Sequence, residues 1–239
     1  MEKSFFLSTD KSPKNIQIKK EIINHFVNNG NDTIAELSKG LDLSVPTVTK
    51  LIGELSDKGL VADFGKIQTA GGRYPNVYGL NPSSVYFIGV DMTRHHLNIA
   101  LMDFKGDIVK YEMGISYMYE NTTDSFDVLC EHIQKFIRET GELKQKIYNI
   151  CLNISGRVNP ESGYSYSSFY FSEEPISNIL SNRLNYKVTV DNDTRSMAYG
   201  EFMKGAVQSE GNVIFVNVSW GIGIGIIIDK KLYYGKSGF

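Results

Sequence analysis

The chain has 239 residues, 41% of them hydrophobic, which is long enough for a small module beside one larger domain with its own core. A net charge of −2 excludes strong steering of nucleic acid by the whole chain, and two cysteines outside any CxxC pair argue against a disulfide framework or a zinc site within it. No stretch is long and apolar enough to span a membrane and the N-terminus carries no export signal, so we expect a cytoplasmic protein without a membrane partner.

A first helix is predicted near the N-terminus by the apolar positions Ile16, Ile22, Ile23, Phe26 and Val27. Four lysines gather where this helix begins: Lys11, Lys14, Lys19 and Lys20. They form either a solvated helix face or a set of phosphate contacts, and we favour the solvated face.

Residues 33–61 have the spacing of a helix-turn-helix. Apolar residues recur at helical intervals in two groups, Ile34, Leu37 and Leu41, then Val48, Leu51, Ile52 and Leu55. Ser44 is placed to cap the second helix, and Pro46 is tolerated in its first turn because the missing N–H has no helical partner there. Any helical hairpin shows two such stripes, but the outward face here is small and polar, as a helix in a major groove requires. The predicted DNA contacts on it are Ser44, Pro46, Thr47, Thr49 and Lys50.

Residues 60–80 predict a β-hairpin, which makes the module a winged helix. Its tip carries Arg73 beside Gly71 and Gly72, so the arginine is predicted to enter a minor groove or hold a phosphate, although an ordinary hairpin turn has the same pattern. Residues 1–80 hold ten Lys or Arg against nine Asp or Glu, a net of only +1. Two copies are therefore expected to cooperate on DNA.

A second domain is predicted from about residue 81. Residues 85–92, 97–104 and 107–116 predict an antiparallel meander, followed by a helix at 123–139 and a strand at 148–155. Further elements are a helix at 175–184, a strand at 187–193, a helix at 194–202 and two strands within 212–229. The alternation predicts an α/β layered domain.

Four segments of the chain resemble the ROK family, a group of bacterial repressors and sugar kinases. They are the wing tip GGRYP, FIGVDM followed by LNIALMDFKGDIV, VDNDTRSMAYGE (residues 190–201) and SWGIGIGIIIDKKLYYGKSGF (residues 219–239). The resemblance implies a winged helix-turn-helix at 1–80, then an actin-like, hexokinase-like (ribonuclease H-like) domain. Its first lobe would span 81–189, and 190–239 would begin an incomplete second lobe.

Two departures from the family's kinases concern the phosphate loops. Where those kinases have a glycine-rich first turn, residues 91–96 read DMTRHH, and bulky side chains there would keep backbone amides from phosphates. In the second loop Trp220 stands where the kinases have a small hydroxyl residue. Gly221, Gly223 and Gly225 remain, but glycines in a strand turn also serve close packing. The resemblance thus implies a non-enzymatic domain with a lost nucleotide site.

Asp193 matches the family carboxylate that takes a proton from a sugar hydroxyl in kinases. Without ATP it is expected, with Asn192, to bind sugar hydroxyls, although an Asn-Asp pair after a strand is also a common helix cap. Gly156 would lie on a loop beside the sugar. Arg157 either faces a phosphate, if the effector is a phosphorylated sugar, or is an ordinary surface arginine. The aromatic run at 164–171 either stacks on a sugar or packs.

The resemblance implies a sugar-responsive repressor of carbohydrate metabolism genes, acting on double-stranded DNA as a homodimer or homotetramer, with a sugar or sugar phosphate more often an inducer than a corepressor. The chain stops where the family continues into a GE-GH motif and a cysteine-rich segment, so we expect no cofactor here and zinc only in that further segment. Two alternatives stay open. One is an ATP-dependent sugar kinase with Asp193 as its base, and the other is a regulator whose second domain only dimerises or binds a protein partner.

Overall fold

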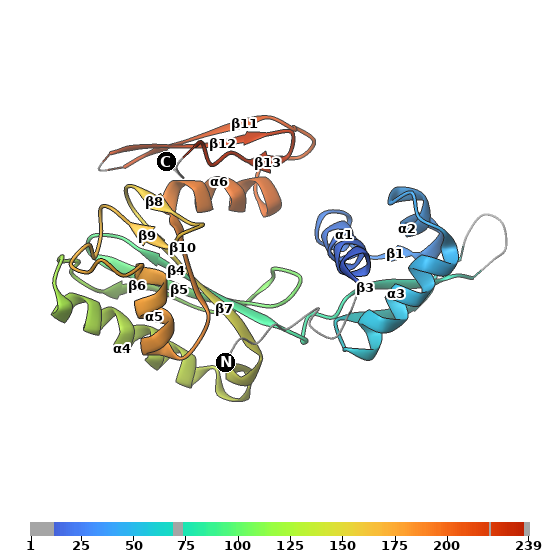
Figure 1. Cartoon of the computed structure of the whole chain (residues 1–239), viewed down its shortest axis with the longest axis horizontal. Helices are drawn as coiled ribbons and strands as arrows, with labels where there is room; N and C mark the ends of the chain where they lie inside the picture. The colour runs from blue at the N-terminus through green and yellow to red at the C-terminus, as the bar shows by residue number, and fades with distance from the viewer. Residues whose placement is uncertain (1–11, 69–73, 220, 237–239) are drawn as a thin grey trace. The chain divides into compact units, whose positions relative to one another are not determined.

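The structure is a computed structural model that describes residues 12–68, 74–219 and 221–236. They fold as two compact units (Figure 1). The first runs through Val85 and includes Asp103–Asp107, and the second comprises Tyr86–Met102 and the described residues from Ile108 onward. The domain bounds 1–80, 81–189 and 190–239 stay predictions.

The first unit is a helix-turn-helix followed by a β-hairpin, as predicted. Its helices are α1 (Pro13–Asn29), α2 (Ile34–Gly40) and α3 (Val45–Asp57), and its strands are β1 (Asp32–Thr33), β2 (Val61–Lys66) and β3 (Asn76–Leu80). The strands form an antiparallel sheet in the order β1-β3-β2. The two-residue strand β1 was not predicted, because so short a segment carries no alternation of apolar and polar residues.

The three helices of the first unit bury their apolar stripes against one another. On α1 the buried residues Ile18, Ile22 and Phe26 follow at intervals of four, and α3 buries Val48, Leu51, Ile52 and Leu55. The prediction of a solvated lysine face was wrong for Lys19, whose side chain is only 2% exposed. Lys14 and Lys20 are exposed, and Lys11 lies outside the described residues.

The second unit is built on a five-stranded sheet in the order β10-β7-β4-β5-β6. Its strands are β4 (Tyr86–Met92), β5 (His96–Met102), β6 (Ile108–Ser116), β7 (Ile147–Ile154) and β10 (Val188–Asn192). The predicted meander is confirmed, since β4, β5 and β6 pair antiparallel. Strands β7 and β10 then add in parallel, which brings the carboxyl ends of β4, β7 and β10 to the same edge.

Helices α4 (Thr123–Glu139) and α5 (Ile176–Leu184) cover one face of this sheet (Figure 1). Alternate strand residues such as Ile88, Val90 and Leu152 are buried in a core with Leu129 and Leu180 of the helices. The sequence did not predict the 3-10 helix η1 (Gly141–Lys146) or the small hairpin of β8 (Val158–Asn159) and β9 (Tyr164–Ser165).

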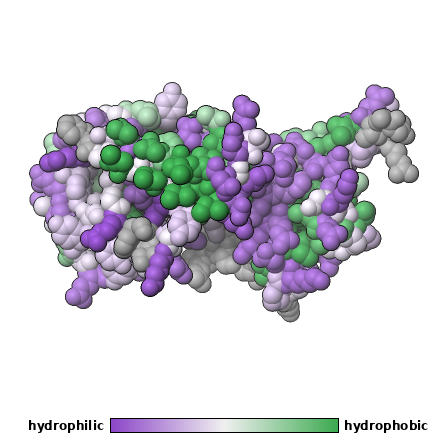
Figure 2. Space-filling model, turned by 90° about the horizontal axis from the view of Figure 1, so that it is seen from above, coloured by the Kyte–Doolittle hydropathy of each residue, from purple (hydrophilic) through white to green (hydrophobic). Residues whose placement is uncertain are grey.

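After β10 the chain forms α6 (Asp193–Lys204) and a three-stranded antiparallel sheet of β11 (Val213–Val218), β12 (Ile222–Ile228) and β13 (Lys231–Leu232). One face of this sheet packs on α6 (Figure 1). Its strands also expose the apolar side chains Ile214, Val216, Val218, Ile222, Ile224 and Ile228. Figure 2 shows a contiguous green area on the second unit, over this sheet, besides smaller green areas elsewhere.

Candidate functional site

The second helix of the helix-turn-helix, α3, presents a polar outer face. The Ser44 side chain caps α3 by accepting a hydrogen bond from the Thr47 amide at 3.3 Å, as predicted. Ser44, Pro46, Thr49 and Lys50 are exposed and Thr47 is half-buried. The Thr49 hydroxyl donates to the Val45 carbonyl at 2.8 Å. The residues proposed to touch DNA therefore share an accessible face, while their contact with DNA stays a prediction.

A charge pair that the sequence did not predict joins α1 to α3. The buried Lys19 ammonium lies 2.6 Å from Glu54 Oε2, and Glu54 is 34% exposed. The other Glu54 oxygen lies 3.8 Å from the ammonium of Lys50, one turn earlier on α3. Lys19 therefore offsets a carboxylate that borders the predicted DNA-contacting face.

The base of the wing is held by Asp63 on β2. Its carboxylate accepts hydrogen bonds from the Gly65 amide at 2.8 Å and from the Asn76 side chain of β3 at 2.5 Å. Gly65 has a φ of 91°, which favours glycine. The predicted DNA contact Arg73, with Gly71 and Gly72, lies outside the described residues.

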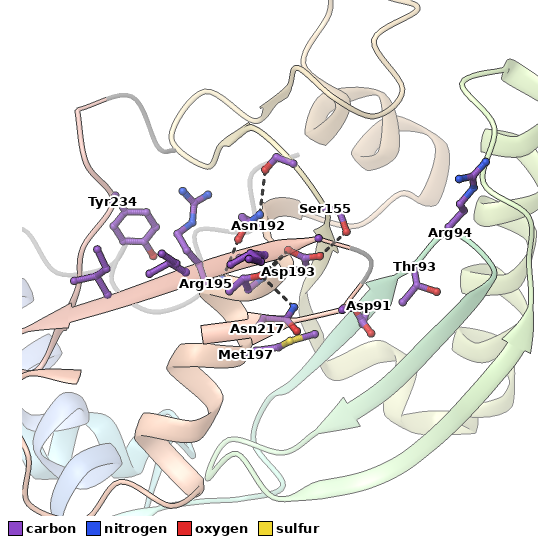
Figure 3. A pocket seen from close by; sticks show the side chains of 18 of the residues that line it. Asp91, Thr93, Arg94, Ser155, Asn192, Asp193, Arg195, Met197, Asn217 and Tyr234 are labelled. Carbon is purple, nitrogen blue, oxygen red and sulfur yellow. Dashed lines mark hydrogen bonds between the residues drawn. The ribbon is translucent and has the colours of Figure 1, made fainter. Parts of the chain in front are cut away.

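A pocket of about 920 Å³ lies in the second unit, where the carboxyl ends of β4, β7 and β10 meet the sheet of β11 and β12 (Figure 3). The predicted residues Gly156, Asn192 and Asp193 all line it. Polar side chains of the lining also include Asp91, Thr93, Ser155, Thr194, Asn217 and Ser219. The structure thus brings the three predicted residues together, and their sugar contact stays a prediction.

Asn192 and Asp193 begin α6 and are fixed by their neighbours. Asn192 accepts from the Arg195 amide at 3.0 Å, so it is a helix cap, and its amide group donates to the Gly156 carbonyl at 3.0 Å. Asp193 accepts from the Ser155 hydroxyl at 2.5 Å and from the Thr194 amide at 2.6 Å. The capping alternative is therefore observed for Asn192, and it holds both residues at the pocket wall (Figure 3).

Gly156 is required by the local backbone. Its φ is 92°, and a Cβ there would lie 2.5 Å from the Ser167 side chain. The following amide, that of Arg157, donates to the Ser167 hydroxyl at 2.9 Å. The Arg157 side chain is not part of the pocket lining. The glycine therefore shapes the loop that presents Ser155.

Asp91, at the end of β4, was not among the predicted site residues. It accepts from the Asn98 side chain at 2.9 Å. Burial raises the pKa of the Asp91 carboxyl, and the nearby charge of Asp193 raises it further, although the Asn98 hydrogen bond opposes both. Its signal in the sequence was its place at the start of DMTRHH, the turn that the resemblance matches to a phosphate loop. Asn217, the penultimate residue of β11, gave no such signal.

The buried cation of the site is Arg195 on α6. Its guanidinium lies 2.6 Å from Asp191 Oδ1 and donates to the Val158 carbonyl at 3.1 Å, and the arginine side chain is 6% exposed. The ring of Tyr234 lies 5.3 Å from it. The i, i+4 spacing of Asp191 and Arg195 was the available sequence signal.

The first predicted phosphate turn is a closed hairpin between β4 and β5. The Thr93 amide donates to the His96 carbonyl at 3.0 Å, and the Thr93 hydroxyl donates to the same carbonyl at 3.0 Å. Arg94, His95 and His96 are exposed. The Thr93 amide and the His96 carbonyl are therefore engaged in the hairpin, and the turn is not a glycine-rich phosphate cradle.

In the second predicted loop, two glycines serve packing. A Cβ at Gly223 would lie 2.1 Å from the Thr194 hydroxyl, and one at Gly225 would lie 2.3 Å from the Ala198 Cβ. Nothing lies within 4 Å of a Cβ at Gly221. Gly223 and Gly225 thus let β12 approach α6, which is the packing alternative named from the sequence. Trp220 lies outside the described residues.

The aromatic run at 164–171 packs only in part, because Tyr166, Tyr170 and Phe171 are exposed. Phe169 is buried, with its ring centroid 5.1 Å from Tyr119 and 5.4 Å from Phe126. Ser167 and Ser168 line a second cavity of about 630 Å³, which shares Ser155 and Gly156 with the pocket. None of the aromatic rings of this run lines either cavity.

Residues 12–68, 74–219 and 221–236 contain neither a metal-binding cluster nor a membrane-spanning helix. No three His, Cys, Asp or Glu side chains gather there so that they could hold a metal ion. Burial raises the pKa of the Cys130 thiol to about 12 and also raises that of Cys151. No helix in this part of the chain is long and apolar enough to cross a membrane.

Comparison with known proteins assigns both units. Residues 17–62 match the model described as winged helix-turn-helix DNA-binding, and residues 87–239 match the ROK family model. The xylose repressor of Bacillus subtilis is 27% identical over 92% of this chain and 57% of its own length. The N-acetylglucosamine repressor of Escherichia coli O6:H1 is 28% identical over 86% of this chain and 50% of its own.

This chain is also similar to a solved structure that is described as a ROK family transcriptional regulator and homologue of the E. coli MLC protein. The match covers 94% of this chain and 57% of that chain, at a TM-score of 0.75 and 22% sequence identity. At that identity the likeness shows the fold. The chain spans about half the length of the curated relatives it matches. Because the family model covers more than half of the chain, the protein belongs to the ROK family.

Proposed function

We propose that this chain acts in the cytoplasm as a non-enzymatic, sugar-responsive repressor of carbohydrate metabolism genes. The observation that carries the proposal is the pairing of a winged helix, whose outer face is accessible, with a pocket walled by Asn192 and Asp193. The names of the relatives, which are repressors for xylose and N-acetylglucosamine, support it. The closed hairpin at Thr93–His96 favours a regulator over a kinase, because it lacks a glycine-rich phosphate cradle.

The proposed mechanism is linkage between sugar and DNA. A sugar that binds one arrangement of the repressor more tightly shifts the population toward it, and operator affinity falls if that arrangement misplaces the recognition helices. Two copies are required, because a module with a net charge of +1 neutralises few phosphates. The partners are a double-stranded operator, a sugar effector and further copies of the chain.

The test begins with selection of binding sequences from a random duplex library, followed by fluorescence anisotropy with and without xylose, N-acetylglucosamine or glucose. We expect one sugar to change operator affinity about 5- to 150-fold, the usual range of such coupling. Asp193→Asn should keep DNA affinity and lose the sugar response, while Asp127→Asn, on the exposed face of α4, should keep both.

Two outcomes count against the proposal. If no sugar changes DNA affinity, the sensing function is wrong. If the protein phosphorylates a sugar with ATP, and Asp193→Asn abolishes turnover, the chain is a sugar kinase with a DNA-binding module instead.

A further inference from the structure

We infer that the pocket selects an uncharged sugar over its phosphate ester, an inference that rests on the proposed function and specifies its effector. The lining contains two carboxylates, Asp91 and Asp193. Asp91 is bonded to the neutral side chain of Asn98, and Asp193 to the neutral groups of Ser155 and Thr194. These partners orient the carboxylates without cancelling their charge. A ligand with a phosphate would therefore meet like charge at the wall.

The buried cation of the pocket is already committed to the protein. The Arg195 guanidinium is held by Asp191 at 2.6 Å and by the Val158 carbonyl at 3.1 Å, with the side chain 6% exposed. A phosphate that displaced Asp191 from this guanidinium would leave the Asp191 carboxylate unpaired, with its side chain only 16% exposed. Arg195 therefore does not offset Asp91 and Asp193.

The N-terminus of α6, which would ordinarily favour an anion, is occupied by the protein's own acceptors. The Thr194 amide donates to Asp193 Oδ1 at 2.6 Å, and the Arg195 amide donates to Asn192 Oδ1 at 3.0 Å. Asp193 also supplies the negative charge that the helix dipole attracts. A phosphate at this point would have to compete with a built-in carboxylate.

The remaining basic groups of the lining, Arg94 and His95, belong to the exposed hairpin turn. In Figure 3 the Arg94 guanidinium is directed away from Asp91 and Asp193. Electrostatic attraction by these solvated groups is screened by water and salt. Their attraction for a phosphate is therefore weaker than the repulsion from the two carboxylates.

An uncharged sugar fits the same groups. Ionised carboxylates accept hydrogen bonds from hydroxyls, and such charge-assisted bonds are strong. Asn217, which donates to the Thr194 hydroxyl at 3.3 Å, keeps its carbonyl as a further acceptor. Met197 and Tyr234 add apolar surface to the lining for the C–H face of a sugar ring. The pocket thus offers acceptors and an apolar wall, which is what a polyol requires.

The test is calorimetric titration of the full chain with matched pairs: xylose and xylose 5-phosphate, glucose and glucose 6-phosphate, N-acetylglucosamine and its 6-phosphate. For the pair that binds, we expect the ester to bind at least about tenfold more weakly, with a difference that narrows as salt rises. Equal or tighter binding of the ester overturns this inference and leaves the proposed function standing. No binding by any member overturns the proposed function and this inference with it.

Asp91→Asn separates the charge of the pocket from its shape. It should narrow the preference for the uncharged sugar several-fold, whereas Asp127→Asn changes the net charge equally at an exposed site on α4 and should leave the preference intact. Circular dichroism checks that each variant is folded. An unchanged preference in a folded Asp91→Asn variant contradicts the inference. If that variant does not fold, the salt series on the unaltered chain gives the same decision.

Discussion

The recognition helix of the first unit and the pocket of the second use polar side chains in opposite ways. On α3, the Lys50 side chain is 66% exposed. The observed hydrogen bond of the Thr49 hydroxyl goes to the Val45 carbonyl, one turn earlier in the same helix. Around the pocket, Asp193 and Arg195 are each bonded to groups from other elements of the second unit. A surface that meets a large charged partner can leave its side chains mobile, whereas a pocket for a small ligand must hold them in place. Substitutions should therefore cost more stability at the pocket than on α3.

The largest effect is expected for Arg195→Met. This change leaves Asp191 unpaired at 16% exposure, and removal of one partner of a buried pair costs about 3–5 kcal/mol. The free energy of unfolding, measured by urea titration, should fall by this amount. Arg183→Met is the matched control, because the Arg183–Asp127 pair is about half exposed on both sides and should contribute less than about 1 kcal/mol. Equal losses in the two variants would contradict the comparison.

Lys19→Met tests the one buried charge pair described between α1 and α3. Glu54 would lose the closer of its two cations but is 34% exposed, so water reduces the loss to about 2 kcal/mol. Urea titration of Lys20→Met, on the exposed side of the same helix, should show a change within about 0.5 kcal/mol. A double variant with Glu54→Leu should recover most of the stability, and failure to recover would show that Lys19 acts through another contact.

Gly225→Ala should destabilise the second unit by about 1–2 kcal/mol, because its new Cβ would lie 2.3 Å from that of Ala198. Gly221→Ala is the control, since nothing lies within 4 Å of the added atom. Thermal unfolding of the two variants, compared with the unaltered chain, measures the difference. Similar melting temperatures would mean that β12 and α6 can separate without cost.

These glycines show where sequence reasoning reached and where it stopped. The order of helices and strands was predictable, because apolar periodicity in α3, α4 and the meander reports burial directly. The Ser44 cap was also predictable, since capping depends on adjacent residues. The roles of Gly223 and Gly225 had to stay open between phosphate binding and packing, because only the fold places Thr194 and Ala198 against them.

The candidate site was predictable only in part, because some of its residues belong to a sequence motif and others are brought to it only by the fold. Gly156, Asn192 and Asp193 were located by their motif, and the structure brings them to one wall. Asp91, Asn217 and the pairing of Lys19 with Glu54 depend on contacts between distant segments. A lysine near a helix start is usually solvated, so its burial against α3 could not be read from local sequence.

Lys50→Ala tests the exposed side of the comparison. Lys50 is 66% exposed and lies 3.8 Å from Glu54, so its loss should change the free energy of unfolding by no more than about 0.5 kcal/mol. Operator binding should weaken, and if Lys50 contacts a phosphate the salt slope should fall by about 1. Anisotropy titrations at several salt concentrations measure this. Lys135→Ala, an exposed residue of α4, is the control and should leave the slope unchanged.

The smallest effect concerns the pH dependence of stability through Asp91. Burial raises the pKa of its carboxyl above the ordinary 3.8, and the charge of Asp193 adds to the shift. The folded chain therefore binds this proton more tightly than the unfolded chain, and the contribution of Asp91 to stability is fully present below pH 3.8 and lost as pH rises through the raised pKa. Relative to the unaltered chain, Asp91→Asn should become more stable across this interval and level off above it.

Because Asp193 supplies part of the shift, Asp193→Asn should move the transition of Asp91 toward lower pH. Urea titrations between about pH 4 and 8 measure both curves, and a constant difference between Asp91→Asn and the unaltered chain would show that the two carboxylates do not share one electrostatic environment.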